Sequence, residues 1–273
     1  MLIVESHSLD VFKNLAIEEY LMDEVQDRGP VLFLWRSACA VVIGKNQNPW
    51  GECRLDLMET DGVPLARRIS GGGTVYHDKG NLNYCVITKR EDYREQHAYD
   101  LIFDALGNLG IHAERSGKSN LSVKGLKFSG NAFAFRRGRA LHHGTLLFTA
   151  DLEQLGRYLG PMVKGIETHA IASVPAKVMN LGIGMTPMTE ALKGAFGRHY
   201  GGSPLFEWTD LDLDQSVIED LEEVKRSDAW LYGTTPRFSV PDGGSVLEVL
   251  KGYVVDGKNQ GKSFRELAFS LVC

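Results

Sequence analysis

Three strand-like runs in close succession constrain the fold of this chain more than any other feature of its sequence. The runs LSV, LKFSGNAFAF and ALHHGTLLF lie between residues 121 and 148, and the turn signals Lys124-Gly125 and Arg137-Gly138 separate them. Short turns join neighbouring antiparallel strands, whereas parallel strands need a long crossover. The segment is therefore predicted to form successive antiparallel hairpins, with residues 136–139 at the tip of one of them.

Helical segments are interspersed among the remaining strand candidates. Apolar residues recur at helical spacing in 10–25, 97–109 and 151–159, and Thr186-Pro187 predicts the capped start of a helix that runs to about Tyr200. Strands and helices do not alternate strictly, which argues against a doubly wound parallel sheet. The sequence predicts an α+β (mixed α/β) fold whose central, largely antiparallel sheet is flanked by helices. The other strand candidates are apolar runs at 31–37, 38–44, 64–70 and 82–88.

Composition narrows the class of protein. The chain has 273 residues and a net charge of -5, so a broad basic surface for nucleic acid is not expected. Its longest apolar runs, 31–35 and 38–43, are too short to cross a membrane, and the first residues lack the basic region of a secretory signal. The four cysteines are widely spread, without a CxxC pair, and are expected to be reduced thiols. A cytoplasmic enzyme or binding protein is the prediction.

The segment RRISGGGTVYHDKGN, residues 67–81, is the strongest candidate for a functional site. Three successive glycines allow close approach of the backbone to a ligand, and successive N–H groups can form a nest for an anion. One of Arg67 and Arg68 could bind a phosphate bidentately. The other interpretation is a glycine-rich turn with two surface arginines. The neighbouring polar string 76–78 favours a site, although the segment is not a standard phosphate loop.

Two further segments carry polar groups in apolar surroundings. Lys127 lies between Leu126 and Phe128, and such a lysine either extends to the surface or points into a cleft to neutralise an anion. His143, in the run LHHGTLL, could hold a ligand or move a proton, but a structural role is about equally expected.

Taken together, RRISGGGTVYHDKGN, GLKFSGNAF and HHGTLLFTADL resemble the lipoate–protein ligase family, which is related to biotin ligases and octanoyltransferases. The strings NLAIEEYL, VMNL and WLYGTTPRF are further landmarks of the resemblance, which covers roughly residues 1–240. It implies a biotin/lipoate-ligase-like catalytic domain at 1–240. Residues 241–273 would then be a short C-terminal extension, expected to form a hairpin and a short helix. This extension resembles a truncated accessory domain, or leaves room for a separate accessory subunit.

The resemblance also implies an activity and a set of site residues. Family ligases activate lipoate with ATP to give lipoyl-AMP, and transfer the lipoyl group to a lysine of a 2-oxoacid dehydrogenase lipoyl domain or of the glycine-cleavage H protein. By matched position, Lys127 is the catalytic lysine, which contacts the acyl carbonyl and the α-phosphate. Mg2+ is expected with ATP, without named ligands. The residues implied to hold the nucleotide and lipoyl-AMP are Arg68, Gly71, Gly72, Gly73, Thr74, Val75, Tyr76, Asn81 and Lys127, with His143, Gly144 and Thr145 as further candidates.

Other functions remain open at this point. An octanoyl or lipoyl transferase would need a cysteine nucleophile, but the segments 114–116 and 161–165, where the family places one, contain none, and Cys85 is expected to be a small core residue. A non-catalytic module that binds lipoylated protein or nucleotide is a second alternative, because Asn120 stands where family ligases carry Asp. Biotin ligation is a weaker one.

Overall fold

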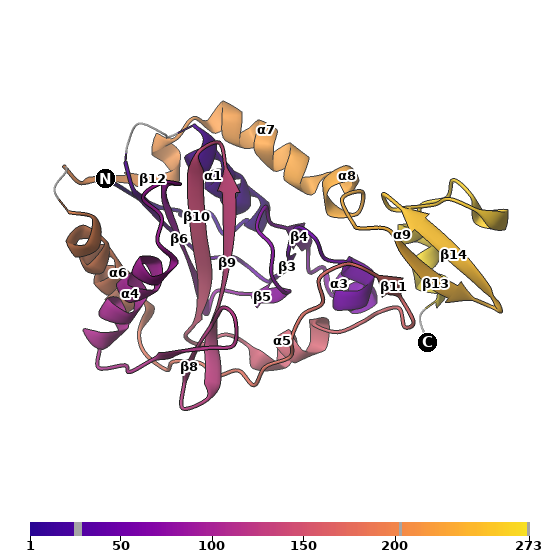
Figure 1. Ribbon diagram of the computed structural model, residues 1–273, viewed down its shortest axis with the longest axis horizontal. Coiled ribbons are helices and arrows are strands. Elements are labelled where there is room, and N and C mark those ends of the chain that lie inside the picture. Colours follow the sequence, from indigo (N-terminus) through magenta and orange to yellow (C-terminus); the bar gives the residue numbers. More distant parts are fainter. Residues whose placement is uncertain (25–28, 202–203, 272–273) are drawn as a thin grey trace. The chain divides into compact units, whose positions relative to one another are not determined.

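The computed structural model describes residues 1–24, 29–201 and 204–271, and the chain divides into two compact units (Figure 1). The first unit comprises residues 1–38, 77–151 and 176–222, and the second comprises 39–76, 152–175 and 223–273. Each unit is therefore assembled from three separate stretches of sequence. The glycine-rich loop belongs to the second unit, and Lys127 belongs to the first.

An eight-stranded sheet forms the centre of the first unit. Its strands are β1 (Leu2–Glu5), β2 (Val31–Trp35), β6 (Asn81–Lys89), β7 (Glu114–Ser116), β8 (Asn120–Val123), β9 (Leu126–Arg136), β10 (Arg139–Leu147) and β12 (Phe206–Thr209). The order is β12-β1-β2-β6-β10-β9-β8-β7, and all pairs from β2 to β7 are antiparallel. Only β1 pairs in parallel, with β2 and with β12. The predicted α+β class with a largely antiparallel sheet is confirmed.

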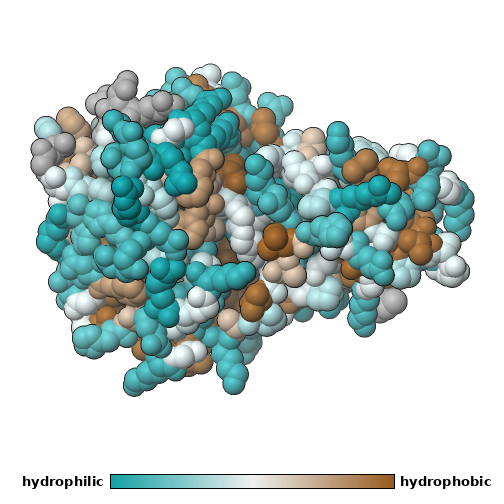
Figure 2. Space-filling model, viewed as in Figure 1, coloured by the Kyte–Doolittle hydropathy of each residue, from teal (hydrophilic) through white to brown (hydrophobic). Residues whose placement is uncertain are grey.

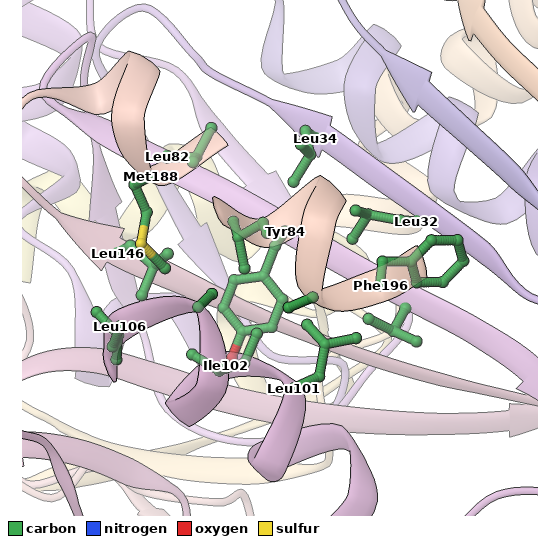
Figure 3. Packing of buried hydrophobic residues seen from close by; sticks show 14 of the residues in the cluster. Leu32, Leu34, Leu82, Tyr84, Leu101, Ile102, Leu106, Leu146, Met188 and Phe196 are labelled. Atoms are coloured by element: carbon green, nitrogen blue, oxygen red, sulfur yellow. The ribbon is translucent and has the colours of Figure 1, made fainter. Parts of the chain in front are cut away.

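Alternate residues of the central strands form the hydrophobic core of the first unit. Leu82, Tyr84 and Val86 of β6 all belong to one buried cluster, because side chains two apart on a strand share a face. Figure 3 shows Tyr84 among Leu32, Leu101 and other apolar side chains from the sheet and from two helices. Burying each large apolar side chain stabilises the fold by about 1.5–3 kcal/mol. The helices of this unit are α1 (Val11–Asp23), α4 (Glu95–Gly107), α6 (Met185–Tyr200) and α7 (Gln215–Arg226), the last of which continues into the second unit.

Helix α6 begins one residue earlier than the sequence predicts. Gly184 occupies the cap position, so Thr186 and Pro187 lie inside the first turn and the predicted Thr186 cap is wrong. A proline is tolerated there because the first N–H groups of a helix have no partner within the helix.

The second unit contains two small sheets around its own core. The strands are β3 (Ala40–Ile43), β4 (Leu65–Arg67), β5 (Val75–His77), β11 (Glu167–Thr168), β13 (Phe238–Asp242), β14 (Ser245–Leu250) and β15 (Tyr253–Val254). They form the orders β4-β3-β5 and β11-β13-β14-β15. Trp50 is fully buried and its ring packs against those of Phe238 and Phe264. The helices are α2 (Pro49–Glu52), α3 (Leu55–Asp61), α5 (Leu152–Tyr158), α8 (Asp228–Leu231) and α9 (Phe264–Ala268).

The end of the chain forms the β13–β14 hairpin and the short helix α9, as the sequence predicts. Strand β13 runs across the predicted domain boundary after residue 240, and that boundary stays a prediction. Val246, Leu250 and Tyr253 are exposed here, and Figure 2 shows hydrophobic residues on this part of the surface. Among the described residues, no helix combines the length and the apolar character needed to span a membrane.

Candidate functional site

The glycine-rich loop that follows β4 depends on backbone positions that only glycine fits. Gly72 has a φ of +84°, in the left-handed region that side chains disfavour. Gly44, at the end of β3, packs against the loop so closely that an added Cβ would lie 2.4 Å from the Gly72 carbonyl oxygen. Side chains at either position would therefore displace the loop.

Arg68 fixes the orientation of the loop's peptide groups. Its Nη2 donates to the carbonyl oxygens of Gly71 and Gly73, at 2.5 and 2.7 Å, and its Nε donates to Ser70 Oγ at 3.0 Å. In a trans peptide the N–H points opposite to the C=O, and the described chain has no cis peptide bond. The N–H groups that follow these two carbonyls, those of Gly72 and Thr74, therefore point away from the guanidinium.

One of these N–H groups already has a partner in the same unit. The Thr74 N–H donates to Ser173 Oγ at 2.9 Å, and the Thr74 hydroxyl lies 3.0 Å from Gln47 Oε1 and 3.3 Å from a Glu52 oxygen. Glu52 in turn accepts from the Ser173 N–H at 3.1 Å and contacts its hydroxyl. The sequence did not predict Gln47, Glu52 or Ser173, and no periodicity or motif marks them.

The rest of the predicted loop contributes structure. Tyr76 is buried in the core of the second unit, where its hydroxyl donates to Cys39 Sγ at 3.4 Å and its ring packs against Tyr158. Val75 is half-buried beside it on β5. Of the predicted nucleotide residues, the structure thus brings together Arg68 and residues 71–74, while the Tyr76 side chain points into the core.

In the first unit, Lys127 lies against Gly130 on β9. An added Cβ at Gly130 would be 3.1 Å from Lys127 Nζ, and the Gly130 N–H donates to Thr145 Oγ1 at 3.2 Å. The backbone of Lys127 is held by the VMNL segment, because its N–H donates to Lys177 O and its carbonyl accepts from Met179 N–H. Lys127 and Thr145 therefore meet at one glycine.

Predicted residues of two neighbouring strands share the face of Thr145. The antiparallel register places Thr145 opposite Asn83 and His143 opposite Cys85, and Asn81 lies two residues before Asn83 on the same face. Asn81 Nδ2 donates to Asn83 Oδ1 at 3.1 Å. Among the described residues, the buried Asn81 Oδ1 and Asn83 Nδ2 have no hydrogen-bond partner. Unsatisfied buried polar atoms cost about 1–3 kcal/mol each, which a polar ligand would recover.

A buried carboxylate from helix α1 completes this face. Glu18 is 1% exposed, accepts from Trp35 Nε1 at 3.1 Å and lies 2.8 Å from His143 Nδ1. The His77 ring stands edge-on to Trp35, with ring centroids 5.4 Å apart. The sequence analysis missed Glu18 and Trp35, although Glu18 lies inside the landmark NLAIEEYL and a buried charged residue in such a helix is a usable signal.

Cys85 lies on the same face but does not have the environment of a nucleophile. It is fully buried, and this burial, with the nearby Glu18 carboxylate, raises the pKa of its thiol well above the usual range. A reactive cysteine needs a stabilised thiolate and access to substrate. The geometry therefore argues against a thioester at Cys85.

Gly144 faces the opposite side of the sheet from His143 and Thr145. An added Cβ there would lie 2.6 Å from the Tyr84 hydroxyl and 2.7 Å from Asn131 Oδ1, two groups that contact each other. Gly144 therefore gives room to a core hydrogen bond and does not present its Cα to the face of Lys127.

Metal ligands are not evident. In the part of the chain that the structure describes, no three His, Cys, Asp or Glu side chains gather in a way that could hold a metal ion. Asn120, which replaces the family's Asp, lies directly opposite Gly130 on β8 and thus beside the Lys127 segment.

Comparison with known proteins agrees with these sites. The model of the lipoyl protein ligase A/B catalytic domain matches residues 10–197. A lipoate-protein ligase A of Bdellovibrio bacteriovorus is 39% identical over 245 residues, which are 86% of this chain and 72% of that protein.

Two solved structures have the same fold. LipL1 of P. falciparum, in complex with lipoate, has a TM-score of 0.72 and 26% identity, over 93% of this chain and 82% of that one. A lipoate-protein ligase A bound with ATP has a TM-score of 0.68 and 25% identity, over 81% of this chain and 93% of that one. The chain therefore belongs to the lipoyl protein ligase A/B family and is an ATP-dependent lipoate–protein ligase.

Proposed function

We propose that the glycine-rich loop of the second unit binds the phosphates of the nucleotide, and that Lys127 of the first unit stabilises the reacting acyl group. The observation that carries the first role is the pair of hydrogen bonds from Arg68 to the Gly71 and Gly73 carbonyls, which directs the next N–H groups away from the guanidinium. Such N–H groups form an anion-binding nest. Asn81 supports the second role, since its buried oxygen lies on the face that carries Thr145.

The chemistry needs positive charge and oriented donors in both steps. In the first step a lipoate carboxylate oxygen bonds to the α-phosphorus of ATP and the bond to pyrophosphate breaks. Two anions approach each other there, so cationic and N–H groups must offset their repulsion. In the second step the amine of an acceptor lysine bonds to the acyl carbon, AMP departs with the bonding electrons, and the amine loses a proton. The Lys127 ammonium would stabilise the charge on the carbonyl oxygen.

We expect Mg2+ to arrive with ATP as part of the nucleotide substrate, because magnesium in such sites is bound largely through phosphate oxygens. The acceptor proposed for the lipoyl group is a lysine of a 2-oxoacid dehydrogenase lipoyl domain or of the glycine-cleavage H protein. The proposed compartment is the cytoplasm, where the free thiols of Cys39, Cys53 and Cys85 would stay reduced. A separate accessory subunit is not required by these roles.

Mass spectrometry of a lipoyl domain tests the proposal directly. Incubation with the enzyme, ATP, magnesium and lipoate should add one lipoyl group to the domain. The Lys127→Ala variant should lower this rate by about 10²-fold or more, the usual effect of removing a group that stabilises a developing charge. Pyrophosphate release should fall with it.

A matched variant and one substitution of substrate guard the interpretation. Lys89→Ala removes an exposed lysine from the same unit and should leave the rate unchanged. Normal turnover by a folded Lys127→Ala enzyme would refute the role of Lys127. A mass gain that requires octanoyl carrier protein in place of ATP would instead indicate a transferase.

A further inference from the structure

Arg67 is a buried guanidinium that binds only neutral oxygens. It is 1% exposed, and its Nε and Nη2 donate to the Leu231 carbonyl at 3.0 and 2.5 Å, while Nη2 also donates to Thr235 Oγ1 at 3.0 Å. Its Nη1 donates to the carbonyls of Gly44, Lys45 and Gln47 at 3.2, 3.0 and 2.9 Å. Burial lowers the pKa of Arg67 to about 10, so the group stays charged at neutral pH. Unlike Arg68, it has its donors directed away from the glycine-rich loop.

On one side, Arg67 holds the turn at residues 44–47, and this turn holds the loop. Lys45 N–H donates to the Ser70 carbonyl at 2.8 Å. Gln47 Oε1 accepts from the Gly44 N–H at 2.8 Å and lies 3.0 Å from the Thr74 hydroxyl. A shift of the turn would therefore move both ends of the loop, at residues 70 and 74.

On the other side, Arg67 is held by the segment 230–235, which lies within the landmark WLYGTTPRF. Trp230 Nε1 donates to the Arg67 carbonyl at 2.7 Å, and the buried Lys225 ammonium lies 4.5 Å from the Trp230 ring centroid. The segment thus binds Arg67 through its backbone and through its guanidinium. Neither the phosphate nest nor Lys127 gives this landmark a role.

We propose that Arg67 is a positioning residue that couples the segment 230–235 to the glycine-rich loop and thereby sets the affinity of the ligase for ATP. The inference rests on the proposed nucleotide role of the loop. The guanidinium is suited to this task because its planar fork carries five donors in fixed directions. A lysine ammonium has three donors at one point and cannot bind the 44–47 carbonyls and the Leu231–Thr235 pair together.

Steady-state kinetics separate positioning from general damage. Arg67→Lys should raise KM for ATP by about tenfold while KM for lipoate stays within about twofold, because only the loop loses its support. Thr235→Val and Trp230→Phe each remove one bond to Arg67 and keep side-chain shape, so they should raise KM for ATP in the same direction by a smaller factor. These two variants decide the matter if Arg67→Lys does not fold.

Two further variants assign any failure to its cause. Arg157→Lys changes a half-exposed arginine of the same unit that pairs with Asp61, and should leave both KM values unchanged. Gly73→Val reports on the loop itself: an added Cβ would lie 3.1 Å from Ser173 Oγ, and its branches should raise KM for ATP strongly.

An unchanged KM for ATP in Gly73→Val would overturn the loop's nucleotide role and the coupling with it. A raised value in Gly73→Val, with unchanged values in the Arg67, Thr235 and Trp230 variants, would overturn the coupling alone. Equal rises in KM for ATP and for lipoate in those three variants would also refute it, since they would indicate general structural damage.

Discussion

His142 is a neutral histidine in the core of the first unit. It is fully buried, its Nε2 lies 2.9 Å from Asn131 Oδ1, and its ring packs edge-on against Phe133 and Tyr99. Burial lowers the pKa of His142 to about 3, and the neighbouring His143 and Arg115 act in the same direction. The unfolded chain, with an ordinary histidine pKa of about 6.5, binds a proton that the folded protein does not accept until far lower pH.

Stability should therefore fall as the pH drops below about 6.5. Stability rises with pH wherever the unfolded state holds more protons, so the contribution of His142 is complete above pH 6.5 and is lost progressively toward pH 3. At pH 5 the loss should be about 2 kcal/mol. Urea unfolding of His142→Gln at pH 7.5 and pH 5 should show a smaller difference than the parent, and exposed His112→Gln should not. Identical pH dependence in all three proteins would contradict the assignment.

Strand alternation explains why the sequence alone left the roles of His142 and His143 open. Neighbouring residues of a strand face opposite sides, so one histidine had to enter the core and the other the face of Thr145. The sequence does not show which, because the answer depends on the β-bulge between Leu121 and Ser122 and on the partner strands. The Glu18 contact to His143, from a helix 125 residues away, settles the orientation and has no local signal.

Strand β10 is the element that connects the two faces of the central sheet. It pairs with β6 and β9 along most of its length, and it presents His143 and Thr145 to one face and His142 to the other. Gly144 lies in its middle, where the Tyr84 hydroxyl and Asn131 occupy the space of a side chain. The spacing of the three strands therefore depends on the missing Cβ.

Gly144→Ala should destabilise the protein by about 1–3 kcal/mol, the usual cost of overpacking a core. The added methyl group must separate Tyr84 from Asn131 or push β10 away from its neighbours. Gly107→Ala is the matched control, since a Cβ there meets nothing within 4 Å at the end of α4. The free energy of unfolding in urea measures both. Equal stability of the two variants would show that the contact is readily relieved.

At the level of elements, local pattern predicted the hairpins β8 to β10 because their turns are short and their partners adjacent. The same reasoning did not predict β1 or β12. These strands pair in parallel across two hundred residues, as Leu2 opposite Phe206 shows, and a run of four residues has too little periodicity to identify a strand.

The whole molecule has two cores, and the end of the chain completes the second. Phe264, Val249 and Val254 are buried with Trp50 and Tyr76, so residues after 240 pack with the strands that flank the glycine-rich loop. Phe264 is fully buried, with its ring centroid 4.9 Å from that of Trp50. The C-terminal extension is therefore part of the support of the loop's unit.

Phe264→Ala should cost about 3–5 kcal/mol of stability, because it removes a buried ring and leaves a cavity. Phe269→Ala, at a site 40% exposed in the same segment, should change stability by less than about 0.5 kcal/mol. Denaturant unfolding measured for both variants gives the comparison. A Phe264 variant as stable as the Phe269 variant would show that the extension contributes little to this core.

The sequence predicted the fold class and the residues of the loop, since these depend on local pattern and on a recognisable string. It did not predict the network of Gln47, Glu52 and Ser173 around Thr74. These residues come from separate stretches of the second unit and meet only through the folding of that unit. The division of the chain into two interleaved units has no sequence signal either.

The hydroxyl of Ser173 on the Thr74 amide makes nucleotide capture an exchange of partners. An incoming phosphate oxygen that takes this N–H gains only the difference between an anionic acceptor and a serine, not the full strength of a new bond. In return, the vacant loop never has to be organised from scratch. The enzyme gives up some grip on its fuel and gains a receptor that keeps its form between catalytic cycles.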